Sequence, residues 1–261
     1  MHQPDRAEFF AEVLASAGQL ADIVGTHDPD VRVPTCPDWN LRQLATHVGR
    51  VHRWAAEIVS TRAAERIPFN SVPDGKYPDG AADRAAWINA GADRVIAAIR
   101  AAGDEPVWAF GRLAPASFWA RRQAHETLMH RVDAELAVGR EVLLDEGMAA
   151  DGIDEWLGSV TDPRYRQQGD ESQALPAGAA LHLRATGTGE PGDGAAAEWV
   201  IRSAGGGLSL HRGPGPADVS VCGPADRLLL VLVRRVPAED TALAVTGDAT
   251  LFSGWLGATP F

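Results

Sequence analysis

The sequence predicts two domains: a four-helix bundle followed by a small α+β domain with an antiparallel sheet. The chain has 261 residues, about as many as one hydrophobic core can serve. Apolar residues recur at helical spacing through the first part of the chain, and later they alternate with polar residues in short runs. We expect the bundle over residues 1–160, a polar linker over 161–178 and the α+β domain over 179–261.

The first part of the chain contains apolar patterns with the period of an α-helix. The predicted helices cover about residues 5–25, 40–58, 81–102, 116–138 and 145–159. Asn40 can cap the second helix, with Gln43 in the capping-box position, and Gly139 is a natural stop for the fourth. A proline-rich loop over 67–80 separates the second helix from the third. Four helices with one long connection are typical of a bundle, and the fifth leads out of it.

Short alternating runs separated by glycine and proline predict strands in the last part of the chain. These runs cover 181–185, 199–202, 208–211, 219–221 and 242–245. An apolar stretch, Ala225–Val233, predicts a helix after Gly223-Pro224, and another short helix begins after Gly247-Asp248. Strands of this kind, joined by tight turns, predict an antiparallel meander.

Charge and composition exclude several classes of function. Lysine and arginine total 24 against 35 acidic residues, so a net charge of −11 argues against a nucleic-acid partner. The longest strongly apolar run, Leu228–Val233, is far shorter than the ~20 residues of a membrane span. Two cysteines, Cys36 and Cys222, are too few for a disulfide framework. Without a recognisable signal peptide, we expect a cytoplasmic monomer or homodimer.

Three side chains predict a metal site in the bundle. Glu126 and His130 are four residues apart, so they share one face of the fourth helix, and His47 lies in the apolar middle of the second. Two histidines and one glutamate with an open fourth position are the ligands of a catalytic zinc, although Ni²⁺, Cu²⁺ or Co²⁺ also suit them. On spacing alone, a surface ion pair or structural histidines are the simpler explanation of the pattern.

Longer segments resemble a known family. Pro34–His47 (PTCPDWNLRQLATH) resembles the start of the second helix in the mycothiol-dependent maleylpyruvate isomerase family. Phe118–Glu135 (FWARRQAHETLMHRVDAE) is similar to that family's other metal-binding helix, in a bundle of the DinB-like group of thiol-dependent metalloenzymes. Stretches that resemble its C-terminal domain, related in fold to sterol-carrier proteins, are Ala217–Val221, Gly223–Ala225, Leu228–Leu232, Arg235–Pro237 and Val245–Ala249.

The resemblance implies an actinobacterial enzyme that holds Zn²⁺, or another divalent metal, at His47, Glu126 and His130 and uses mycothiol as cofactor or co-substrate. A thiol bound to zinc loses its proton at neutral pH and becomes a nucleophile. The expected partners are this small-molecule thiol and an anionic or electrophilic substrate. The reaction is either the isomerisation of a maleylpyruvate-like substrate or the transfer of mycothiol to an electrophile.

The resemblance also implies a catalytic arginine. The family places it in a Gly-Arg pair before proline, and here the match falls on Arg235 of Arg234-Arg235-Val236-Pro237. A guanidinium holds a carboxylate through two parallel hydrogen bonds. Because Arg234 replaces the glycine, either arginine could face the site, or the pair could simply cap a helix C-terminus.

Two alternative functions remain open at this stage. In one, the second domain is a non-catalytic module that binds a small molecule or lipid, and the bundle is its scaffold. In the other, the open metal position holds water, and the protein is a metal-dependent hydrolase. Near the site, we expect Asp133 to pair with a neighbouring arginine rather than to accept a hydrogen bond from a ligand histidine, and we expect Cys36 to be structural.

Overall fold

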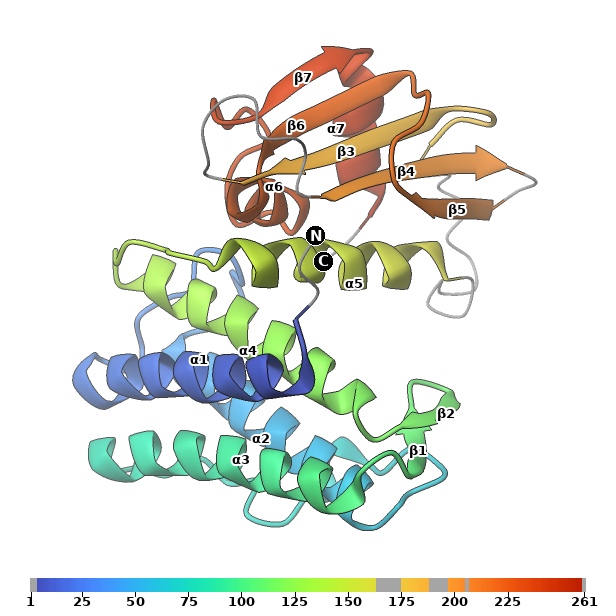
Figure 1. Cartoon of the computed structure of the whole chain (residues 1–261). Helices are drawn as coiled ribbons and strands as arrows, with labels where there is room; N and C mark the ends of the chain where they lie inside the picture. Colours follow the sequence, from blue (N-terminus) through green and yellow to red (C-terminus); the bar gives the residue numbers. More distant parts are fainter. Residues whose placement is uncertain (1–3, 163–174, 188–196, 205–206, 260–261) are drawn as a thin grey trace. The chain divides into compact units, whose positions relative to one another are not determined.

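The computed structural model describes residues 4–162, 175–187, 197–204 and 207–259 (Figure 1). Internal contacts divide the chain into two compact units, a first unit over Pro4–Val142 and a second unit from Leu143 onward. Most of the predicted linker, 163–174, lies outside the described residues.

The first unit is the predicted helical bundle. Its elements are α1 (Arg6–Thr26), α2 (Leu41–Ser60), the 3₁₀ turn η1 (Phe69–Ser71), α3 (Ala81–Ala102), β1 (Pro106–Ala109), β2 (Arg112–Pro115) and α4 (Phe118–Ala137). Helix α1 packs on α3 and α4, and α2 also packs on α3 and α4, so each helix buries one face against two others. The four predicted helices are confirmed.

Local capping explains where two of these helices begin. Asp5 caps α1, and Asn40 caps α2 in a full capping box with Gln43, as the sequence predicts. At the end of α4, Gly139 adopts a φ of 69°, a left-handed conformation that glycine takes without strain.

Glycines allow α2 and α3 to approach closely. A Cβ added at Gly49 would lie 2.0 Å from the ring of Trp87, and one added at Gly91 would lie 2.7 Å from Arg53 Nη1. The Arg53 guanidinium lies 4.2 Å from the Trp87 ring centroid and donates to the carbonyls of Gly49 and Trp87. Burial lowers the pKa of Arg53 to about 10, yet the group is still a cation at neutral pH. This contact fixes the position of α2, which carries His47.

The first unit also contains a small β-hairpin that the sequence does not predict. Strands β1 and β2 pair antiparallel through a turn at Phe110 and Gly111, whose φ values of 49° and 84° are both left-handed. Each strand has only four residues, too few for an alternating pattern to be recognised in a loop between two helices.

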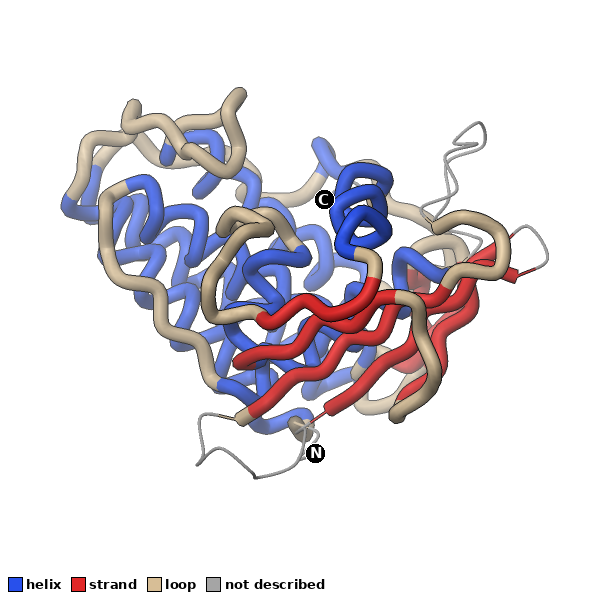
Figure 2. Tube along the Cα trace, turned by 90° about the horizontal axis from the view of Figure 1, so that it is seen from above, coloured by secondary structure: helices blue, strands red, loops and turns tan. Residues whose placement is uncertain are grey.

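The second unit is an α+β domain (Figure 2). Its helices are α5 (Glu146–Thr161), α6 (Ala225–Leu232) and α7 (Ala249–Ala258). Its strands are β3 (Ala180–Thr186), β4 (Ala197–Ala204), β5 (Gly207–Arg212), β6 (Val219–Pro224) and β7 (Ala244–Gly247). In the described residues these strands form one sheet in the order β5-β4-β3-β6-β7.

The prediction of a purely antiparallel sheet was wrong at one pairing. Strands β5, β4 and β3 form an antiparallel meander, but β6 pairs parallel with β3. After β5 at one edge of the sheet, the chain crosses to the far side of β3 and runs in the same direction as β3. Alternation in the sequence shows which residues of a strand share a face, but it does not show which strand lies beside it. The parallel pairing of β3 and β6 could therefore not be predicted from the alternation.

Helix α5 packs within the second unit. Asp154 accepts hydrogen bonds from the Trp199 indole at 3.0 Å and from Arg212 Nε at 2.5 Å. The Trp156 and Trp255 ring centroids are 5.1 Å apart, which joins α5 to α7. Helix α5 therefore belongs to the second unit, whereas the sequence predicts a first domain that extends to residue 160.

The close approach of α2 and α3 can be tested at its glycine. Gly49→Ala is expected to lower the free energy of unfolding by about 1–3 kcal/mol, because the new methyl group overlaps the Trp87 ring. The measurement is the urea unfolding midpoint. The matched control is Gly18→Ala in α1, where an added Cβ meets nothing within 4 Å and should leave the midpoint unchanged or raise it. Equal losses for both variants would contradict this account.

Candidate metal centre

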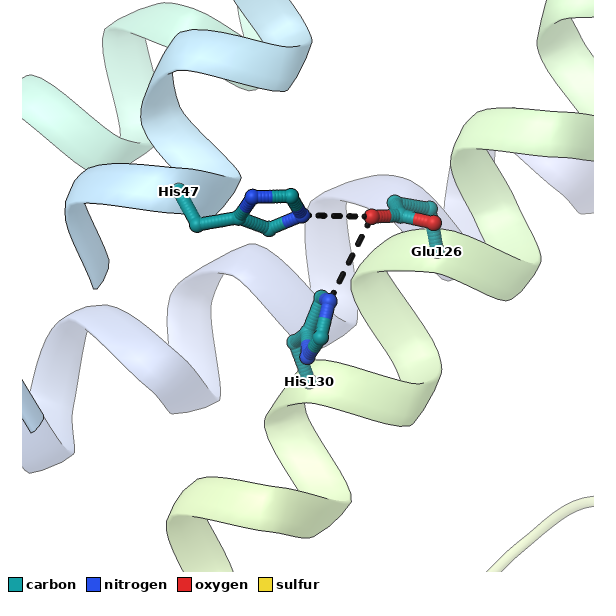
Figure 3. Close-up of side chains that lie close together, drawn as sticks. All are labelled: His47, Glu126 and His130. Atoms are coloured by element: carbon teal, nitrogen blue, oxygen red, sulfur yellow. Dashed lines mark hydrogen bonds and ion pairs between the residues drawn. The ribbon is translucent and has the colours of Figure 1, made fainter. Parts of the chain in front are cut away.

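His47, Glu126 and His130 lie together in the first unit (Figure 3). One ligand atom from each lies within 4.8 Å of the other two. Glu126 Oε1 is 2.9 Å from His47 Nε2 and 3.3 Å from His130 Nε2. The structure thus brings together the three residues that the sequence predicts as ligands.

Helix geometry and helix packing explain why they meet. Glu126 and His130 are one turn apart on α4, so both project from the same face. Helix α2 packs against α4 and presents His47 to that face. The side chains of His47, Glu126 and His130 are 28%, 23% and 12% exposed, so the cluster is partly in contact with solvent.

Electrostatics favour an ionised carboxylate between the two rings. Burial alone would raise the pKa of Glu126, but hydrogen bonds from His130 and His47 outweigh it and hold the pKa well below its usual range. Burial would lower the pKa of His130, but hydrogen bonds to Asp133 and Glu126 raise it to about 9. Arg122 donates to the other carboxylate oxygen of Glu126 at 3.2 Å.

The donor set fits a divalent metal. Two imidazole Nε2 atoms and a carboxylate oxygen are the borderline and hard ligands that Zn²⁺ prefers. In addition, the outer nitrogen of His130 is occupied, since Nδ1 lies 2.8 Å from Asp133 Oδ2. Metal-binding histidines characteristically use their second nitrogen in this way.

The prediction that Asp133 pairs with a neighbouring arginine rather than with a ligand histidine was wrong. In the structure its carboxylate accepts a hydrogen bond from His130. Cys36, read from the sequence as structural, contacts the same carboxylate, with Sγ 3.8 Å from Asp133 Oδ2.

Aromatic rings flank the cluster. The Trp39 centroid lies 5.0 Å from that of His47 and 5.9 Å from that of His130, and Phe69 lies 6.1 Å from His47. The sequence does not predict Phe69, because no pattern marks it in the proline-rich loop. Arg122 is not among the predicted residues either, although its spacing indicates it, because Arg122 lies one turn before Glu126 on the same face of α4.

Other histidines of the first unit stay outside the cluster. His52 is fully buried, and its Nε2 is 2.8 Å from Thr127 Oγ1. His125 packs edge-on against Phe9. The angular offsets along each helix predict this separation, because residues five apart or adjacent point in different directions.

Arg234 and Arg235 lie in the second unit, directly after α6. Arg234 adopts a φ of 58°, and its guanidinium donates to the Thr259 carbonyl. Arg235 is buried, and its Nη1 donates to the Val233 carbonyl at 2.7 Å. A left-handed φ is a conformation that glycine takes without strain and that other residues rarely adopt. The role of Arg235 toward a substrate stays a prediction.

Comparisons with known proteins find the same family in both units. The profile of the mycothiol maleylpyruvate isomerase N-terminal domain matches residues 10–135, and that of the MDMPI C-terminal domain matches 148–254. Among the curated proteins searched, none matches the chain.

Solved structures show the same fold. A crystal structure of the mycothiol-dependent maleylpyruvate isomerase has a TM-score of 0.59 and 16% identity, over 94% of this chain and 96% of that one. A mutant form of that enzyme has a TM-score of 0.60 and 15% identity over the same shares of the two chains. Among the described residues, no helix is long and apolar enough to span a membrane.

Burial of His52 predicts a pH dependence of stability. Burial, with the neighbouring Arg53 charge, lowers the pKa of His52 to about 3. Below pH 6.5 the unfolded chain takes up a proton that the folded chain does not, so stability falls as the pH falls from 6.5 toward 3. At pH 5 the loss relative to neutral pH is about 2 kcal/mol.

The measurement is urea unfolding at pH 7 and pH 5, with a chelator present, for the wild type and His52→Gln. The wild type should lose more stability than the variant over this interval. Equal losses would show that His52 is not the group responsible.

Proposed function

The chain belongs to the mycothiol-dependent maleylpyruvate isomerase family, and on that premise we propose that it is a divalent-metal enzyme, best suited to zinc, that uses mycothiol as cofactor or co-substrate. The observation that carries the proposal is the meeting of two imidazole nitrogens and one carboxylate oxygen from α2 and α4. Three protein ligands with an open fourth position are typical of a catalytic metal site.

His47, Glu126 and His130 would hold the metal through Nε2, a carboxylate oxygen and Nε2. When bound there, the metal lowers the pKa of a coordinated thiol, so that the thiolate forms at neutral pH. The chain's own residues orient the ligands: Arg122 holds one oxygen of Glu126, and the Trp39 ring packs on both histidines. The ring of Phe69 lies beside His47, with the two ring centroids 6.1 Å apart.

The reaction we propose is the isomerisation of a maleylpyruvate-like substrate or the transfer of mycothiol to an electrophile. Both begin with attack by an activated thiol, which the open metal position would hold. An anionic substrate needs a positive partner, and we assign this role to Arg235, on which the family pattern falls. Its guanidinium would hold a substrate carboxylate through two parallel hydrogen bonds.

Hydrolysis is less well supported by the site. A hydrolase would need a carboxylate placed as general base toward a water molecule. Glu126 is shared by His47 and His130, and Asp133 is held by His130. Both carboxylates of the cluster are therefore engaged in holding the histidines.

Metal content tests the site directly. The purified protein should contain about one equivalent of divalent metal, and the double variant His47→Ala, Glu126→Ala should contain little, because it keeps one of the three ligands. Elemental analysis after dialysis makes the measurement. His211→Ala, an exposed histidine of the second unit, is the control and should keep the metal. If the double variant kept the metal content of the wild type, the proposed site would be wrong.

Thiol binding and turnover test the function. The metal-loaded protein should bind mycothiol in a calorimetric titration, and the metal-free protein should not. With maleylpyruvate present, formation of the trans isomer would identify an isomerase, and its absence despite thiol binding would favour an S-transferase. Metal without any affinity for the thiol would favour hydrolysis, and absence of metal would favour a binding module.

Arg235→Lys tests the anion-binding role. The expected loss is about 10- to 100-fold in kcat/KM, because lysine cannot reproduce two parallel charged hydrogen bonds. Metal content and mycothiol affinity should stay as in the wild type. Arg234→Lys is the matched control and should retain activity. The assignment would be reversed if Arg234→Lys showed the larger loss.

A further inference from the structure

We propose that Asp133 is the positioning residue of the metal centre and that Thr35, from the loop before α2, fixes Asp133 in turn. The inference rests on the proposed metal site and concerns how the chain orients His130 within it. Neither Asp133 nor Thr35 is one of the three residues whose ligand atoms converge.

Both oxygens of the Asp133 carboxylate are engaged. Oδ2 accepts from His130 Nδ1 at 2.8 Å, and Oδ1 accepts from Thr35 Oγ1 at 2.5 Å. The Cys36 thiol lies 3.8 Å from Oδ2. The carboxylate is fully buried, so leaving it without these donors would cost free energy. The carboxylate is thus held from two directions, by α4 and by a segment almost 100 residues earlier in the chain.

This arrangement sets the tautomer of His130. A carboxylate only accepts hydrogen bonds, so the nitrogen that faces Asp133 carries a proton. When a metal takes the place of the proton on Nε2, the remaining proton of the ring stays on Nδ1, and Nε2 is the nitrogen that would bind the metal. The same contact fixes the plane of the ring, because Asp133 lies three residues after His130 on α4.

The loop that supplies Thr35 is itself closed by backbone hydrogen bonds. Cys36 N donates to Val33 O at 3.1 Å, Trp39 N donates to Cys36 O at 2.8 Å, and Val33 N donates to Trp39 O at 3.0 Å. The same loop carries the Trp39 ring that packs on His47 and His130. The loop over residues 33–39 therefore contacts both histidines. It holds His130 through Thr35 and Asp133, and the indole of Trp39 packs on His47 and His130.

A purely structural role for Asp133 makes a different prediction. In that case the buried carboxylate would only accept the hydrogen bond from the Thr35 hydroxyl, and its loss would reduce folding stability without changing the affinity of the folded protein for a metal. A positioning role instead predicts a change in metal affinity that is separate from stability. Loss of such outer partners typically costs 10- to 100-fold in metal affinity.

The experiment measures Zn²⁺ affinity by competition with a chromophoric chelator, on protein shown to be folded by circular dichroism. Asp133→Asn should weaken binding about 10- to 100-fold, because the amide can offer Nδ1 a donor and favour the other tautomer. Thr35→Val should weaken binding in the same direction but less. Thr35→Ser, which keeps the hydroxyl, should bind as the wild type does. Co²⁺-substituted Asp133→Asn should also show altered d–d absorption.

Glu135→Gln is the matched control. Glu135 is a buried carboxylate on the same helix, two residues further on, and it accepts from Arg131 rather than from a histidine. Its change to an amide should lower stability and leave Zn²⁺ affinity unchanged.

The outcomes separate this inference from the proposed function. If the wild type binds Zn²⁺ and Asp133→Asn binds it equally tightly, the positioning role is overturned and the metal site stands. If Glu135→Gln weakens binding as much as Asp133→Asn, the effect belongs to α4 as a whole, and the positioning role is again overturned. If the wild type binds no Zn²⁺, both proposals fail.

Discussion

The charge of Glu126 is the constraint on which the site depends. An ionised carboxylate at a half-buried position is stable only with partners that offset its loss of water. His47, His130 and Arg122 supply those partners, two from α4 and one from α2. His130 also hydrogen-bonds to Asp133, so it lies between two carboxylates, those of Glu126 and Asp133. The contacts that compensate these buried charges also orient the three candidate ligands.

The site therefore depends on how α2 is placed in the bundle. His47 comes from a different helix than Glu126 and His130, so the ligand set forms only where α2 lies correctly against α4. The opposite side of α2 is held by α3, where Trp87 lies in the space that side chains at Gly49 would fill. A small residue on the side of α2 that faces α3, two positions after His47, thus helps determine the position of a candidate ligand.

The sequence predicts much of this arrangement, because much of it is local. Helix periods and the Asn40 capping box depend on neighbouring residues, and the spacing of Glu126 and His130 defines a shared face. The bundle pattern suggests His47 as their partner from a second helix, but spacing cannot show which helices pack together, and the family resemblance strengthens this prediction. The partner of Asp133 was not predictable for the same reason: His130 and an arginine were both within reach along α4, and a residue 98 positions away completes the contact. The parallel pairing of β6 and the packing of α5 also depend on distant residues.

The turn after α6 is held by the side chain of its own left-handed residue, Arg234. A non-glycine residue with a φ of 58° is strained by about 1–2 kcal/mol relative to a helical conformation. At Arg234, the hydrogen bond from the guanidinium to the Thr259 carbonyl joins the turn to the end of α7 and offsets part of that strain. The guanidinium of Arg234 is thus engaged within the second unit, at the end of α7. A left-handed residue at this position is compatible with the turn, and the role of Arg235 toward an anionic substrate stays a prediction.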